Sequence, residues 1–94
     1  MKKVFQIADP KKKPARMIEA AKSTINKYVK RERNKQLSPD ANFWDFRCKF
    51  GIDADSAQKV HHKQLFSEID KLNTEEVTSF YVELTAFEAT RRKG

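Results

Sequence analysis

The sequence contains little of the material from which disulfides, flexible loops and membrane anchors are made. One cysteine among 94 residues excludes an internal disulfide. Two glycines are too few for a glycine-rich phosphate loop, and with only three prolines the chain is not a flexible low-complexity sequence. No long apolar run follows Met1, so neither a signal peptide nor a membrane span is predicted. We therefore expect one cytoplasmic domain, residues 1–94, with a frayed basic tail at 91–94.

Positive charge is what the sequence has in excess, and it is concentrated in one segment. The formal net charge is +7. Residues 11–35 hold ten Lys or Arg residues against two acids, a local charge of +8, so the rest of the chain sums to −1. Such a concentration favours polyanions such as nucleic acid or anionic headgroups. The competing interpretation is a solvated helix face that only keeps the protein soluble.

The aromatic segment 43–50 predicts the strand around which the fold is built. Apolar and polar residues alternate along it, as in a strand with one buried face. We expect its apolar face to point into the core through Trp44, Phe46, Cys48 and Phe50.

The basic segment itself predicts a helix from Pro14 to Arg33. Proline suits the first turn because its missing N–H has no partner there. The apolar residues recur at three- and four-residue intervals and form one stripe. This stripe consists of Met17, Ile18, Ala21, Ile25, Tyr28 and Val29.

The remaining segments complete an α+β fold. Strands are expected at 2–8, 57–62 and 79–89, and a second helix at about 63–73. The order predicts a ferredoxin-like βαββαβ two-layer sandwich with both helices on one face of an antiparallel sheet. If 56–73 were instead one long helix, a three-stranded βαβαβ sandwich would remain.

The sequence offers no constellation for catalysis or metal binding. Cys48 lies on the aromatic face and is expected to be a buried, inert thiol. On a strand, His61 and His62 would point to opposite faces and could not bind one metal together. We therefore predict no enzyme, no cofactor, no metal and no small-molecule substrate.

The favoured function is a noncatalytic nucleic-acid-binding module, with RNA preferred to DNA. Cations on the first helix would hold phosphates, and aromatic rings among cations on the open sheet face would stack with unpaired bases. The alternative is a protein-interaction module, such as a homodimer formed through that open face. The candidate nucleic-acid-binding residues are Arg16, Lys27, Lys30, Arg31, Arg33, Lys35, Arg47, Lys49, Tyr81 and Phe87.

Four segments resemble a family of small uncharacterised bacterial proteins. They are residues 12–16, 30–35, 43–51 and 79–83, so the resemblance extends over nearly the whole chain. It implies a soluble single-domain protein from a bacterium. The family has no assigned activity, so the resemblance transfers no catalytic or binding residue.

Overall fold

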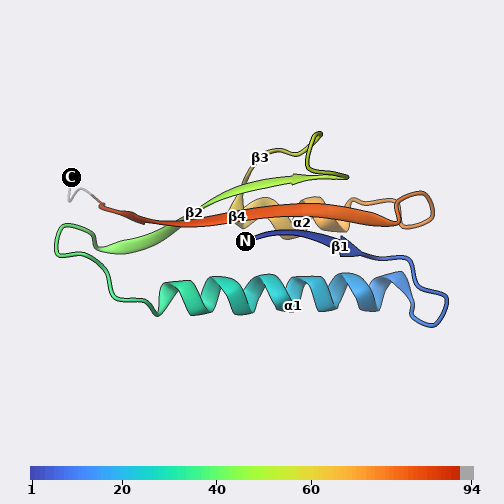
Figure 1. Cartoon of the computed structure of the whole chain (residues 1–94), viewed down its shortest axis with the longest axis horizontal. Coiled ribbons are helices and arrows are strands. Elements are labelled where there is room, and N and C mark those ends of the chain that lie inside the picture. Colours follow the sequence, from blue (N-terminus) through green and yellow to red (C-terminus); the bar gives the residue numbers. More distant parts are fainter. Residues whose placement is uncertain (92–94) are drawn as a thin grey trace.

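The computed structural model describes residues 1–91, which form four strands and two helices in the order βαββαβ (Figure 1). The α+β class and the βαββαβ order confirm the prediction from the sequence. Of the basic tail expected at 91–94, residues 92–94 lie outside the described part. The elements are β1 (Lys2–Gln6), α1 (Pro14–Arg33), β2 (Phe43–Gly51), β3 (Gln58–His61), a 3₁₀ turn (His62–Gln64), α2 (Leu65–Asp70) and β4 (Ser79–Ala89).

The strands form one antiparallel sheet in the order β1-β4-β2-β3. The last strand is therefore central, with β1 on one side and β2 on the other. The hairpin of β2 with β3 aligns Cys48 with Val60, so the four-stranded sheet holds and the three-stranded alternative is excluded. Every neighbouring pair of strands is antiparallel. The fold resembles ferredoxin-like folds in its βαββαβ element order and in its two layers.

The helix α1 begins and ends where the sequence predicts. Pro14 occupies its first turn, and the backbone N–H of Asn34 closes its end on the carbonyls of Arg31 and Glu32. Ala21 and Ile25 are buried, and the rest of the apolar stripe is half-buried beside them. Neither helix in residues 1–91 is both long and apolar enough to cross a membrane.

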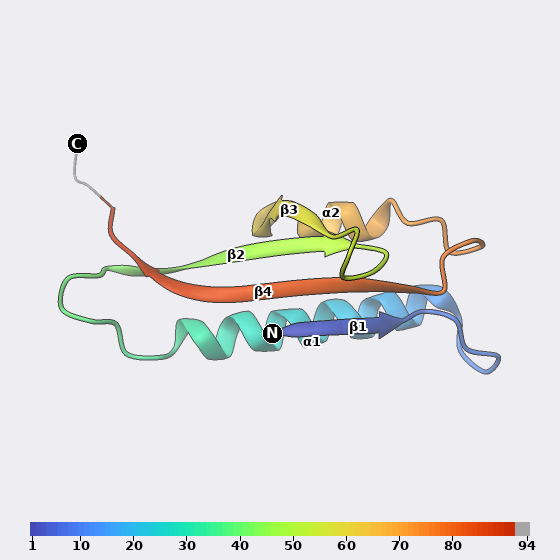
Figure 2. The same ribbon diagram turned by 45° about the horizontal axis from the view of Figure 1, so that its top comes forward.

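Both helices pack on one face of the sheet (Figure 2). The centre of the core is Phe80, which is fully buried on the central strand and stacks on Phe5 with the ring centroids 5.3 Å apart. Alternation along β4 places Phe80, Val82 and Leu84 towards the helices. The core cluster comprises Phe5, Ile7, Ala21, Ile25, Phe46, Cys48, Leu65, Ile69, Phe80, Val82 and Leu84.

Trp44 differs from the expectation of a core residue. It lies on the same face of β2 as the buried Phe46, yet it remains partly exposed. The reason is that α1 ends at Arg33, so that within residues 1–91 no helix extends over this end of the sheet. The indole N–H instead donates a 2.9 Å hydrogen bond to the backbone carbonyl of Lys35 in the following loop.

Three elements are also shorter than expected, and one of them is β3, which covers Gln58–His61 instead of 57–62. The first strand ends at Gln6, although Ile7 still donates its backbone N–H to the carbonyl of Thr78 at 2.9 Å. The second helix covers only Leu65–Asp70, and Leu72 packs on the core from the turn that follows.

Candidate nucleic-acid interface

The ten residues predicted to bind nucleic acid lie on two surfaces, on opposite sides of the sheet. Because α1 covers one face of the sheet, its exposed side points away from the open face (Figure 2). A short nucleic-acid strand cannot contact both surfaces at once. The helix carries Arg16, Lys27, Lys30, Arg31 and Arg33, with Lys35 just beyond it, and the open face carries Arg47, Lys49, Tyr81 and Phe87.

The first surface, here called the basic helix surface, consists of Lys27, Lys30, Arg31 and Arg33, with Arg31 beside Tyr28 and Arg33 beside Phe46 on opposite flanks of the helix. All four side chains are exposed. Within residues 1–91, none of them forms an ion pair with a carboxylate. The nearest acid in sequence, Glu32, is bound by the Lys35 ammonium at 2.5 Å, which holds the pKa of its carboxyl below the usual value. The four cations of the basic helix surface are therefore not neutralised by an ion pair within residues 1–91.

A hollow of about 570 Å³ adjoins the basic helix surface between α1 and the start of β1. Lys27 and Arg31 line it from the helix, and Lys2 and Lys3 line it from the strand. Tyr28 forms part of its wall, where its hydroxyl donates to the Leu84 carbonyl at 3.3 Å and burial raises its pKa. The two strand lysines were missed from the sequence because only the pairing of β1 with β4 brings them beside the helix.

The open sheet face carries the predicted mixture of cations and aromatic rings, but most of these groups already contact a neighbour on the same face. The Arg47 guanidinium lies 4.9 Å from the centroid of Phe87, and that of Arg91 lies 4.8 Å from the centroid of Phe43. Lys49 lies 4.0 Å from the Glu83 carboxylate. Both phenylalanines are half-buried, so each ring has one side against a cation and limited access for a base.

Tyr81 is the predicted stacking residue that the structure makes least accessible. Its side chain faces the open side of the central strand, but the residue is only 9% exposed. Its hydroxyl donates to a Glu83 carboxylate oxygen at 3.2 Å, and burial raises its pKa. In this arrangement its ring offers no free face to a base.

Nearly the whole sequence matches one protein family. A family of unknown function (DUF6172) matches residues 1–93. The chain belongs to this family. No curated protein and no solved structure matches it. Because the match covers residues 1–93, the basic helix surface and the open sheet face both lie within the family's extent, and their function has to be argued from their chemistry.

Cys48 lies on the covered side of the sheet, whereas His61 is exposed opposite Arg47 on the open face. Cys48 is 2% exposed, and burial raises the pKa of its thiol to about 11, so the thiolate is not available at neutral pH. The two histidine side chains were expected to point to opposite faces of a strand, and this was wrong. His62 belongs to the 3₁₀ turn, and its ring stacks on the ring of His61 with the centroids 4.8 Å apart. No group of three potential metal ligands occurs in residues 1–91.

Proposed function

We propose that this protein is a noncatalytic nucleic-acid-binding module that holds phosphates on the basic helix surface. The observation that carries the proposal is the group of four exposed cations on α1 without a carboxylate partner among the described residues. Neutralising phosphates there releases counterions from the nucleic acid, which is the main source of sequence-independent affinity. We also propose that the protein acts in the cytoplasm of a bacterium.

The geometry of the helix supports contact with a run of phosphates. Lys27, Lys30 and Arg31 lie within about 6 Å along the helix axis, whereas Arg33 lies on the other flank of the helix, 5.7 Å from the Phe46 ring. The hollow beside Lys27 and Arg31 adds Lys2 and Lys3, so cations approach the same space from a helix and from a strand. A flexible single strand can follow such a curved path more readily than a stiff duplex.

We propose RNA rather than DNA as the preferred form, with the open sheet face as a secondary contact. The half-buried rings of Phe43 and Phe87, each beside an arginine, provide a limited stacking surface. Unpaired RNA bases suit such rings, although a strand would have to pass around the sheet edge to reach them. RNA and DNA oligonucleotides of the same sequence, compared at equal salt, test this preference.

Self-association through the open face is the second candidate function. Val4 lies on this face, and it is 51% exposed although large and apolar. An interface of this kind depends on apolar burial and changes little with salt, whereas phosphate binding weakens linearly in log salt. Sedimentation at two salt concentrations therefore separates the two candidates.

The decisive experiment is a charge-removal series on nuclease-treated protein. Changing Lys27, Lys30 and Arg31 together to Gln should weaken binding to a mixed single-stranded RNA pool. Each lost phosphate contact reduces the salt slope by about 0.7, so the triple variant should lose about two units. Its melting temperature should hardly change, because exposed charges contribute little to stability.

A matched control removes the same charge elsewhere. Lys11, Lys13 and Lys59 are exposed and lie outside the basic helix surface, so their change to Gln should leave most of the affinity and the slope. Equal losses in the two triple variants would mean that only net charge matters. Absence of RNA binding by the parent at low salt would exclude the proposed function.

A further inference from the structure

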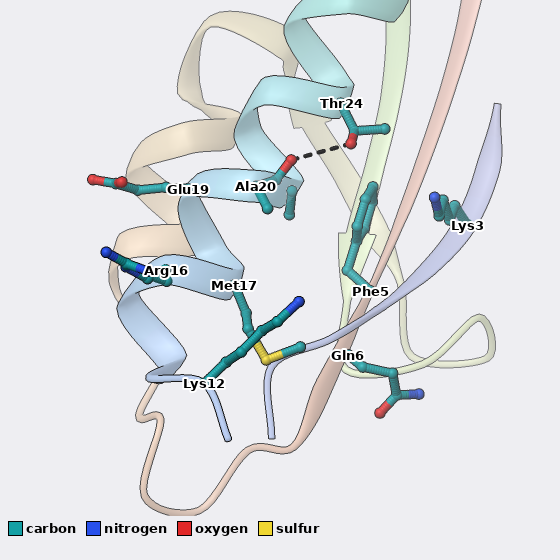
Figure 3. Close-up of a pocket in the computed structure, with 10 residues that line it drawn as sticks. Lys3, Phe5, Gln6, Lys12, Arg16, Met17, Glu19, Ala20 and Thr24 are labelled. Carbon is teal, nitrogen blue, oxygen red and sulfur yellow. Dashed lines mark hydrogen bonds between the residues drawn. The ribbon is translucent and has the colours of Figure 1, made fainter. Parts of the chain in front are cut away.

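A second groove lies between β1 and the N-terminal half of α1 (Figure 3). Its volume is about 660 Å³. Phe5 from the strand and Met17 from the helix point into it and give it an apolar floor. Its other lining residues include three cations, Lys3, Lys12 and Arg16, against the single carboxylate of Glu19.

The strand beside this groove is an edge of the sheet. Within residues 1–91, β1 pairs with β4 alone, and Met1 and Leu84 exchange both backbone hydrogen bonds, at 2.5 and 2.7 Å. Ile7 likewise donates its N–H to Thr78 at 2.9 Å. Antiparallel pairing alternates, so the N–H and C=O groups of the intervening even-numbered residues point away from β4. These residues are Lys2, Val4 and Gln6.

We propose that an extended acidic peptide from a partner protein docks here as an added strand on β1. Its main chain pairs with the outward groups of Val4 and its even-numbered neighbours, as in other cases of strand addition. Alternate side chains of an added strand point to the helix side, where they meet the apolar floor and the cations. The groove therefore accepts apolar and Asp or Glu side chains and disfavours Lys or Arg.

The charge of the edge selects between possible occupants. Lysines on an edge strand discourage pairing with a second copy of the same strand, because Lys2 and Lys3 would meet their own positive charge. An acidic strand meets the opposite charge and is attracted by Lys3, whereas Lys2 already forms an ion pair with Glu83 at 3.5 Å. The other edge strand, β3, has only four residues.

The first test identifies the peptide. Phage-displayed random peptides are selected on the immobilised, nuclease-treated full chain, and the enriched sequences are read. Asp or Glu residues alternating with apolar residues are the expected outcome. No enrichment, or enrichment of basic peptides, would overturn the proposal.

Binding of the tightest of these peptides to variants of the protein is then measured by fluorescence anisotropy, which shows where the peptide docks. Val4→Pro removes one outward N–H and leaves the bonds to β4, because proline is tolerated on edge strands where its nitrogen faces solvent. Losing this main-chain hydrogen bond should lower the affinity for the peptide about tenfold. Val4→Thr keeps the N–H and should bind like the parent.

A second pair of variants acts from the helix and leaves the strand unchanged. Ala20 lines the groove and is exposed, so Ala20→Trp should block it, whereas Ser23→Trp places the same side chain outside the groove. Peptide binding that survives both Val4→Pro and Ala20→Trp would refute the docking mode. If Ala20→Trp weakened RNA binding instead, the groove would belong to the nucleic acid. The two proposals fail separately, because one is measured with peptide on nuclease-treated protein and the other with RNA.

Discussion

Replacement of Phe80 by Ala is the sharpest test of the core. The ring is fully buried on the central strand, and it lies between Phe5 and Phe50 at centroid distances of 5.3 and 5.8 Å. Truncating a buried phenylalanine costs about 3–5 kcal/mol, because apolar burial is lost and a cavity remains. The total free energy of unfolding of a small domain is about 5–15 kcal/mol, so the variant should retain only part of its stability.

Urea denaturation followed by tryptophan fluorescence measures this loss. With a slope of about 1.5 kcal/mol per molar urea, the midpoint should fall by about 2 M or more. Phe87→Ala is the matched control, since it removes the same ring from the half-buried open side of the same strand. It should cost about 1–2 kcal/mol, from partial burial and the contact with Arg47. A loss below about 1 kcal/mol for Phe80→Ala, or equal losses for the two variants, would refute the assignment of the core face.

Two further predictions concern the hairpin and its turn. Burial lowers the pKa of His62, so the unfolded chain takes up a proton first as pH falls below about 6.5, and stability should decrease there. Urea midpoints at pH 7.5 and 5.5 should differ less in His62→Gln than in the parent; an equal difference would contradict this. A Cβ on Gly51 would lie 2.7 Å from the Cα of Ala57, so Gly51→Ala should cost about 1–3 kcal/mol and weaken the amide cross-peaks between β2 and β3. An unchanged denaturation curve and an unchanged NMR spectrum for Gly51→Ala would contradict the close approach of Gly51 to Ala57.

The sequence predicts the elements well because each carries a local pattern. Pro14 and the apolar stripe define α1, and the apolar residues Phe80, Val82, Leu84 and Ala86 at every second position define the core face of β4. Trp44 shows where local pattern fails, because alternation gives the face of a residue and not whether a helix extends far enough to cover it. That depends on where α1 ends relative to β2, which is a tertiary property.

The candidate site was predicted less well, for a related reason. The exposed cations of α1 follow from helical periodicity alone. Tyr81 was assigned to the correct face, but its burial follows from the central position of β4, where the register sets it between Val4 and Gly51. The groove beside β1 could not be predicted, since it requires that the first strand be an edge and that α1 run beside it.

Helix electrostatics distinguishes the two basic regions of α1. Lys30, Arg31 and Arg33 lie in the last turn, where cations interact favourably with the helix dipole. Arg16 lies in the first turn, which contains no acidic residue, and a cation there is unfavourable by about 0.3–1 kcal/mol. The charge at the C-terminal end therefore has a structural explanation besides ligand binding. The charge at the N-terminal end opposes helix stability, and an acidic partner in the adjoining groove would compensate it.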